Sequence, residues 1–139
     1  MIVDASVVLK WGVGEVDSEI AERLFLRSDL AAPAVLHAEL GYTLTKLARQ
    51  QHLTRAETIE AWRQLRQADV AIYDDDALLD PAFELSLVLN ASFYDCVYLA
   101  LAVNTNDVLV TADERFIRAV RASSAFADRV LTLAEATAT

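Results

Sequence analysis

The sequence has few of the residues that cross-link or break a chain, with one cysteine, three glycines and two prolines among 139 residues. A single cysteine, Cys96, excludes an internal disulfide and is typical of proteins kept in a reducing compartment. So few glycines and prolines leave most of the chain free to form helices and strands. Because 55% of the residues are hydrophobic, the chain can bury a core. We therefore expect one globular domain over residues 1–139.

Long apolar runs are also missing. The longest, residues 97–103, is far too short to cross a bilayer. The first residues carry no basic segment before an apolar stretch, so the N-terminus does not resemble a signal peptide. These features predict a cytoplasmic protein without a membrane span.

Positive charge is scarce, since 12 basic side chains face 21 acidic ones and give a formal net charge of −9. Nucleic-acid-binding proteins usually carry a basic surplus, so this balance counts against an extended nucleic-acid surface. A metal-dependent nuclease is not excluded, because its carboxylates face cations that in turn meet the phosphates. An acidic surface would also suit a basic partner protein.

Apolar patterning predicts strands that alternate with helices, which favours an α/β fold with a central parallel sheet flanked by α-helices on both sides. A capping box, Thr54 with Glu57, marks one helix start, and Pro81 is a second expected start. The tail after Glu135 is expected to fray. The predicted strands cover residues 2–3, 30–32, 70–73, 108–110 and 130–131, and the predicted helices cover residues 5–11, 17–27, 34–51, 55–67, 81–89, 92–103 and 114–121.

Two carboxylates follow predicted strands directly. Asp4 comes after the first strand, and Asp113 lies three residues after Val110. In open α/β sheets, ligands bind beyond the carboxyl ends of the strands, so both residues lie where chemistry usually occurs. The alternative is that each acid only caps the helix that follows it.

Two further acids lie on predicted helices. Asp95 is the only charged residue between Asn90 and Val103, and a carboxylate in so apolar a segment needs a cation or strong hydrogen bonds. Its alternative role is a capping box with Ser92. Glu39 has no capping role, but it could simply reach solvent from the edge of its helix.

Taken together, the four acids predict a site for a hard cation. Mg²⁺ and Mn²⁺ prefer oxygen ligands and are held by a few carboxylates, water and substrate phosphate. Such ions can activate water and stabilise the oxygens of a phosphodiester undergoing cleavage. This chemistry requires neither cysteine nor histidine.

Four segments, in this order, resemble the motifs of PIN domains. They are MIVDAS at residues 1–6, PAVLHAEL at 33–40, YDCVYLALA at 94–102 and VTADERF at 110–116. The resemblance spans nearly the whole chain. In size and layout the chain looks most like the VapC toxins of bacterial and archaeal toxin–antitoxin pairs.

The resemblance implies a PIN-like fold and Mg²⁺- or Mn²⁺-dependent endoribonuclease activity. It assigns Asp4, Glu39, Asp95 and Asp113 to an acidic catalytic and metal site. Ser6 and Thr111 match supporting hydroxyl positions, where they would hydrogen-bond the carboxylates or water. The resemblance further implies a homodimer and a cognate antitoxin protein as partners.

Basic and aromatic residues near these motifs suggest contacts with an RNA substrate. Arg115, Arg118 and Arg121 are spaced to share one helix face and could attract phosphates, although a solvated face is an equal alternative. Trp11 could stack on a base, but such a residue more often packs in the protein.

Other functions lack their residues or remain open. His37 and Glu39 match half of the zinc-deaminase signature, but its two further cysteines are missing. A receiver-like phosphoacceptor domain would have paired acids after the first strand and a lysine after the fifth. This sequence has one acid, Asp4, after the first predicted strand and no lysine after the fifth, which disfavours that alternative. A PIN-like module that binds RNA or protein without cleaving it remains the other alternative.

Overall fold

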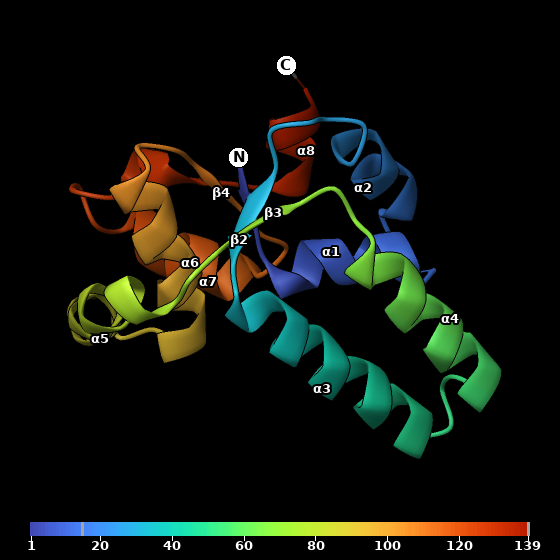
Figure 1. Cartoon of the computed structure of the whole chain (residues 1–139). Helices are drawn as coiled ribbons and strands as arrows, with labels where there is room; N and C mark the ends of the chain where they lie inside the picture. Colours follow the sequence, from blue (N-terminus) through green and yellow to red (C-terminus); the bar gives the residue numbers. More distant parts are fainter. Residues whose placement is uncertain (15, 139) are drawn as a thin grey trace.

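The computed structural model describes residues 1–14 and 16–138, whose helices surround a small central sheet (Figure 1). Most predicted elements appear within a few residues of their expected bounds. In chain order the elements are β1 (Ile2–Val3), α1 (Ala5–Gly12), α2 (Ser18–Leu24), β2 (Ala31–Pro33), α3 (Val35–Arg49), α4 (Arg55–Arg66), β3 (Ala71–Tyr73), α5 (Asp76–Leu89), α6 (Phe93–Asn104), β4 (Leu109–Val110), α7 (Glu114–Arg121), the 3-10 helix η1 (Ala127–Arg129), β5 (Val130–Leu131) and α8 (Leu133–Thr137).

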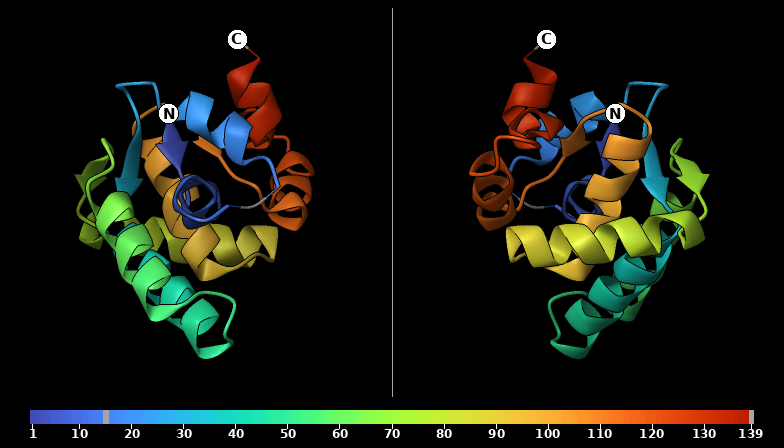
Figure 2. Two further views of the ribbon diagram at one scale, coloured as in Figure 1. Left: turned by 90° about the vertical axis from the view of Figure 1, so that its right-hand side faces the viewer. Right: turned by 90° about the vertical axis from the view of Figure 1, so that its left-hand side faces the viewer.

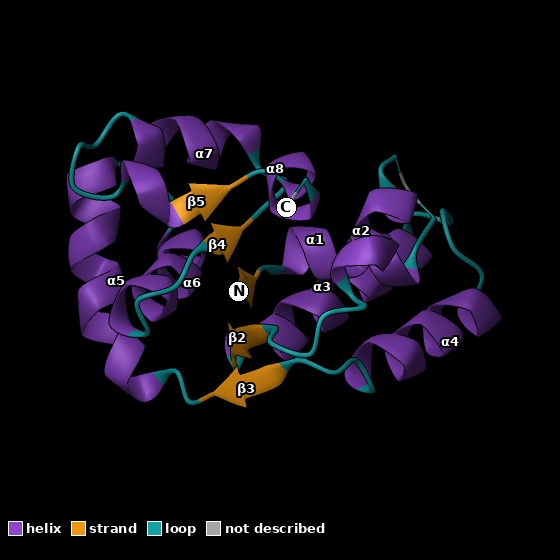
Figure 3. Cartoon of the chain, turned by 90° about the horizontal axis from the view of Figure 1, so that it is seen from above, coloured by secondary structure: helices purple, strands orange, loops and turns teal. Residues whose placement is uncertain are grey.

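The five strands form one parallel sheet in the order β3-β2-β1-β4-β5, which confirms the predicted α/β class. Val3 pairs with Val110, so the residues that follow β1 and β4 emerge side by side at the carboxyl edge. Seen from above, α5 and α6 lie on one side of the sheet and α1 to α4 on the other (Figure 3). The strands are short, so the helices supply most of the core.

Helix α6 is the centre of the hydrophobic core. Every residue from Cys96 to Ala102 is buried, because the helix contacts β1, β2 and β4 on one side and α5 on another. This environment explains why its sequence is apolar all around rather than on one face. Asp95 lies one residue before this buried stretch, where the helix first leaves solvent.

Helices α3 and α4 form an antiparallel hairpin that projects from the body of the molecule in both side views (Figures 1 and 2). On α3, the buried residues Leu36, Leu40 and Leu44 follow the helical period. The predicted capping box at the start of α4 is present, with Thr54 and Glu57 exchanging hydrogen bonds. The hairpin thus extends from the carboxyl edge, where α3 begins after β2.

The expected helix start at Pro81 is wrong, since α5 begins at Asp76 and contains Pro81 in its interior. Two acids that directly precede the helix make hydrogen bonds to backbone N–H groups. Asp74 accepts a hydrogen bond from the backbone N–H of Asp76 at 2.9 Å. Asp75 accepts one from the N–H of Val35 at 3.2 Å, so it caps α3 from a distant part of the sequence.

The expected fraying after Glu135 is also wrong for the residues up to 138, because a short helix, α8, forms there. Thr132 and Glu135 build a capping box that the sequence contains but that we did not use. Glu135 also binds Arg121 at 2.6 Å, and Ala136 is buried. The last residue, 139, lies outside the described residues.

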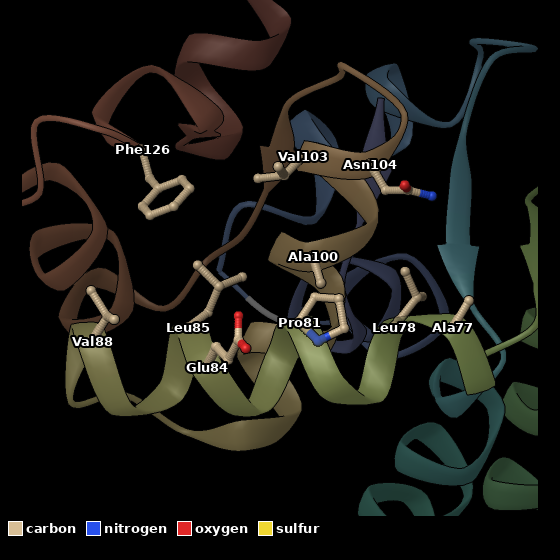
Figure 4. A pocket seen from close by; sticks show the side chains of 10 residues that line it. All are labelled: Ala77, Leu78, Pro81, Glu84, Leu85, Val88, Ala100, Val103, Asn104 and Phe126. Carbon is tan, nitrogen blue, oxygen red and sulfur yellow. The ribbon is translucent and has the colours of Figure 1, made fainter.

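Helices α5 and α6 leave an apolar hollow of about 350 Å³ near Phe126 (Figure 4). Leu85 and Val103 point into it, and Glu84 lies at its border. Among the described residues, no single helix is long and apolar enough to cross a membrane; α5 and α6 reach that length only as a pair bent by 114°.

The contact between α1 and α4 generates a prediction for stability. A Cβ atom added at Gly12 would lie 2.7 Å from two carbons of the Leu65 side chain, which is itself buried. We expect Gly12→Ala to lower the free energy of unfolding by about 1–3 kcal/mol, because the packed leucine must shift. Urea denaturation measures this difference.

Gly14→Ala is the matched control for this change. Apart from its chain neighbours, no described residue has an atom within 4 Å of a Cβ built there, and its φ is not positive. The control should stay within roughly 0.5 kcal/mol of the parent. A Gly12→Ala variant as stable as the parent would contradict the close approach of α1 and α4.

Candidate active site

Asp4 lies between β1 and α1 and is the N-cap of α1. Its Oδ1 atom accepts hydrogen bonds from Ser6 Oγ at 2.6 Å and from the Val7 N–H at 3.2 Å. The residue is only 5% exposed. Burial raises its pKa, and the hydrogen bonds from Ser6, Thr111 and the Val7 N–H oppose that rise only in part. The capping role that we considered as an alternative is therefore real, and it coexists with a buried carboxylate at the sheet edge.

Asp113 occupies the equivalent position after β4 and caps α7 by accepting from the Phe116 N–H at 3.0 Å. Thr111 Oγ1 accepts from the Asp113 N–H at 3.1 Å. Ser6 Oγ accepts from the Ala112 N–H at 3.1 Å while it donates to Asp4. The Ser6 hydroxyl thus ties the turn after β1 to the turn after β4 and fixes the two acids relative to each other.

Glu39 extends from α3 toward the same edge. Tyr98 on α6 donates a hydrogen bond from its hydroxyl to Glu39 Oε1 at 2.7 Å. Burial raises the pKa of Glu39, and the charges of Asp4 and Asp75 add to that rise, while the Tyr98 hydrogen bond lowers it. Glu39 is therefore held against the buried helix α6 instead of reaching freely into solvent.

Asp95 lies in the first turn of α6 and does not form the capping box considered for it. Ser92 is the N-cap residue, but its side chain makes no capping hydrogen bond. Burial raises the pKa of Asp95 to about 7, with further contributions from the charges of Asp4, Asp113 and Glu39. The negative charges of the other three acids therefore disfavour ionisation of the Asp95 carboxyl.

These four acids, which come from widely separated parts of the sequence, line one cavity of about 300 Å³. Their elements are β1, α3, α6 and the turn after β4, all of which present residues at the carboxyl edge of the sheet. The ion pairs formed between described residues involve none of the four. Their negative charges are therefore not neutralised by cationic side chains in ion-pair contact. The cavity is lined by Asp4, Ala5, Ser6, Leu9, Glu39, Thr43, Asp95, Tyr98 and Asp113.

The donor set suits Mg²⁺ or Mn²⁺, because it consists of carboxylate and hydroxyl oxygens. In the described part of the chain, however, no three His, Cys, Asp or Glu side chains stand close enough to share one ion. The acids surround the cavity and do not form a closed ligand shell. Magnesium commonly keeps several waters and uses one or two carboxylates directly, so such an open arrangement is compatible with it.

Tyr98 is the residue of this cavity that our sequence reasoning missed. It is 1% exposed, and burial together with the charge of Glu39 raises the pKa of its hydroxyl. A signal was available, because Tyr98 is a polar side chain one helical turn after Asp95 in an otherwise apolar segment. The hydroxyl of a buried tyrosine needs a partner, and here that partner is Glu39.

The arginines of α7 have different surroundings. Arg115 is exposed and lines a groove of about 300 Å³ together with Asp95 and Asp113. Arg118 is exposed but lines neither this groove nor the carboxylate cavity. Arg121 binds Glu135 and the Val130 carbonyl, which gives it a structural role.

Trp11 packs within the protein, as its more common alternative predicted. Its ring stacks on Phe25 with a centroid distance of 4.3 Å and an interplanar angle of 7°. The stacking of these two residues joins α1 to the end of α2. A role in base stacking is therefore not supported for Trp11.

Comparison with known proteins identifies the family. The sequence matches the PIN domain family over residues 1–122. The chain belongs to the PIN domain family. This PIN domain is 31% identical over 115 residues to ribonuclease VapC9 of Mycobacterium tuberculosis (strain ATCC 25618 / H37Rv), covering 83% of this chain and 87% of the relative. It is 33% identical over 120 residues to ribonuclease VapC3 of the same strain, covering 86% of each chain.

Solved structures agree with the PIN-like fold. PAE2754 from Pyrobaculum aerophilum superposes with a TM-score of 0.73 at 20% identity, covering 99% of this chain and 89% of that one. A chain of a toxin–antitoxin complex from Klebsiella pneumoniae gives a TM-score of 0.65 at 14% identity, covering 95% and 96%. This family membership also removes the reason to consider a receiver-like domain.

The pKa of Asp95 predicts a pH dependence for the metal-free PIN domain. A pKa of about 7, raised from 3.8, means that the folded chain holds this proton more tightly than the unfolded chain. The resulting stability is fully present below about pH 4 and is lost as the pH rises through about 7. With EDTA present at about pH 8, we expect Asp95→Asn to be more stable than the parent by roughly 1–3 kcal/mol.

Urea denaturation of both proteins at about pH 5 and pH 8 measures this effect. The exposed Asp80, which lines neither the cavity nor the Arg115 groove, provides the control Asp80→Asn. The control should follow the parent at both pH values. If Asp95→Asn shows the same loss of stability with rising pH as the parent, Asp95 is not the carboxyl responsible.

The Tyr98 hydrogen bond predicts a change at Glu39. In Tyr98→Phe the carboxylate loses the donor that lowers its pKa, so we expect the pKa of Glu39 to rise further. A carbon-13 NMR titration of the Glu39 carboxyl measures this shift. The exposed Tyr73→Phe is the control and should leave Glu39 unchanged; an unchanged Glu39 in Tyr98→Phe would refute the coupling.

Proposed function

We propose that this PIN domain is an Mg²⁺- or Mn²⁺-dependent endoribonuclease and the toxin of a VapBC-type toxin–antitoxin pair. The observation that carries the proposal is the convergence of Asp4, Glu39, Asp95 and Asp113 around one cavity at the carboxyl edge of the sheet. The similarity to proteins named ribonuclease VapC supports RNA as the substrate.

The proposed roles follow from the surroundings of each side chain. Asp4, Glu39, Asp95 and Asp113 would hold the metal, directly or through water. A divalent ion bound there would polarise the phosphodiester and activate water near neutral pH. The hydroxyl of Ser6 orients the Asp4 carboxylate at 2.6 Å, and that of Thr111 fixes the backbone of Asp113. Tyr98 positions Glu39 in the same manner.

Arg115 is the side chain best placed to meet a phosphate, because its groove shares Asp95 and Asp113 with the carboxylate cavity. We retain Arg118 as a weaker substrate contact, since it is exposed on the same helix. An exposed arginine adds attraction that depends on salt, which matters in a chain of net charge −9.

We propose a cognate antitoxin and a homodimer as protein partners. The structural likeness to a chain of a toxin–antitoxin complex and the acidic charge support a partner with basic residues. For the homodimer, α5 exposes Leu79, Phe83 and Leu87 at a spacing of one helical turn. Such an apolar stripe on a surface helix is typical of an interface between proteins.

We also propose that residues 1–139 act as one domain in the cytoplasm. The C-terminal helix α8 contacts α2, which joins the two ends of the chain in one body (Figure 1). The free, buried Cys96 is compatible with a reducing compartment, where RNA substrates are also present.

Cleavage assays with purified protein and a mixture of cellular RNAs test the proposal. We expect cleavage to require Mg²⁺ or Mn²⁺ and to stop on addition of EDTA. Asp4→Asn and Asp95→Asn should each lose at least about 100-fold in rate, because each removes a charge from the metal site. Asp80→Asn, with the same change in charge at an exposed position outside the cavity, should cleave like the parent.

Circular dichroism and urea denaturation should show that all variants remain folded. Equal cleavage by both site variants and the parent would refute the proposed site. Metal-dependent RNA binding without cleavage would instead indicate the non-catalytic alternative, a PIN-like module that binds RNA or protein. RNA affinity that does not change on chelation would contradict the idea that the acids engage RNA through a metal.

A further inference from the structure

A second groove adjoins the carboxylate cavity on the side of α3. It has a volume of about 500 Å³ and shares Glu39 and Thr43 with that cavity, so the two spaces adjoin at these residues. We call it the tyrosine groove, because Tyr42 and Tyr94 line it. Its lining consists of Val35, Ala38, Glu39, Tyr42, Thr43 and Tyr94.

The two tyrosines expose their rings although neither has a role in the core. Tyr42 is 65% exposed and Tyr94 is 55% exposed, whereas Tyr98 is almost fully buried. Tyr42 lies one helical turn after Glu39 on α3, and Tyr94 directly precedes Asp95 on α6. Two helices thus each place an aromatic ring next to a carboxylate of the cavity.

The chemistry of the tyrosine groove differs from that of the groove on the other side of the cavity. The groove beside α7 holds the guanidinium of Arg115 together with the carboxyls of Asp95 and Asp113. The described residues that line the tyrosine groove include no lysine or arginine, and its one charge is the negative Glu39. A cationic side chain that could meet a phosphate is therefore available beside α7 and is missing from the described lining of the tyrosine groove.

We propose that the tyrosine groove binds an unpaired nucleobase of the RNA, next to the phosphate that is cleaved. The inference rests on the proposed ribonuclease function and adds to it a base-binding subsite formed by Tyr42 and Tyr94. Every base offers a π-face to a tyrosine ring, and this contact does not need a cation.

The position of the groove favours RNA over a second copy of this chain as its occupant. A protein that filled the groove would also cover Glu39 and Thr43, which line the cavity that must admit substrate. A separate apolar stripe on α5 is available for contact between copies. A strand of RNA can instead pass from Arg115, across the acids, to the tyrosines.

A fluorescent base provides a direct test of stacking. Single-stranded RNA oligonucleotides of mixed sequence carry 2-aminopurine at one position, which is moved along the strand. With Mn²⁺ present, we expect the parent to quench the fluorescence at one or two neighbouring positions. Tyr42→Ala and Tyr94→Ala should each lose this quenching and bind the RNA roughly 5- to 100-fold more weakly. Tyr42→Phe and Tyr94→Phe should keep both properties.

Cleavage kinetics should separate binding from chemistry. Because the groove holds a base beside the reacting phosphate, we expect the alanine variants to raise KM with little change in kcat. An abasic nucleotide at the quenched position should weaken parent binding as much as the alanine variants do, and it should not weaken the variants further. Tyr73→Ala, an exposed tyrosine outside the groove, should behave like the parent.

The outcomes distinguish this inference from the proposed function. Cleavage that is unaffected by both alanine variants and by the abasic nucleotide overturns the groove assignment and leaves the ribonuclease intact. Quenching without any cleavage supports the groove and overturns the ribonuclease. If the parent protein does not bind RNA at all, both the groove assignment and the proposed ribonuclease function are overturned. Alanine variants that change the oligomeric state, measured by analytical ultracentrifugation, would identify the groove as an interface between copies and overturn the inference.

Discussion

The burial of the Asp4 carboxylate at the end of β1 is the constraint on which the rest of the site depends. The carboxylate of a residue that is only 5% exposed must receive hydrogen bonds or lose its charge. Two of its donors are Ser6 and the Val7 N–H, and both are in place only because α1 begins directly after Asp4. Pairing of Val3 with Val110 then brings Thr111 alongside, and Ser6 reaches across to the Ala112 N–H. The register of two very short strands therefore determines the position of the acids.

The same arrangement costs stability when no cation is present. Four acids around one cavity lose hydration and repel one another. At Asp95, burial first and then the charges of Asp4, Asp113 and Glu39 raise the pKa to about 7. Burial of the apolar stretch from Cys96 to Ala102 in α6 offsets this loss of stability and fixes the position of the carboxylate next to it. A site that binds cations strongly must have negative charge that the protein leaves unpaired, so packing elsewhere compensates for the loss.

The sequence could predict the features that follow from local rules. The ends of the predicted strands indicated that Asp4 and Asp113 lie at the carboxyl edge of the sheet. The apolar character of residues 97–103 indicated that Asp95 borders the core. The helix-capping alternative was correct for Asp4 and Asp113 without excluding their place in the cavity, because one carboxylate has two oxygens. Asp95 behaved differently, since Ser92 does not cap with its side chain.

Features that depend on distant contacts could not be predicted. Glu39 pairs with Tyr98 across 59 positions of sequence, and Asp75 caps α3 across 40 positions. No local pattern reports such partners, because they depend on how the helices pack on the sheet. Helix α8 is a different case, since Thr132 and Glu135 form a capping box that could have been recognised. The helix start expected at Pro81 was wrong, because α5 begins five residues earlier at Asp76 and continues through the proline.

The distribution of charge has a consequence for substrate choice under the proposed function. Most nucleases gain affinity from a basic surface, and such affinity is independent of sequence. This chain has a net charge of −9, one arginine in the groove beside α7 and no cation lining the tyrosine groove among the described residues. Weak attraction to phosphate leaves the metal site and contacts to bases as the main sources of affinity. A double helix hides its bases, so such a surface discriminates against duplex RNA before any individual base is recognised.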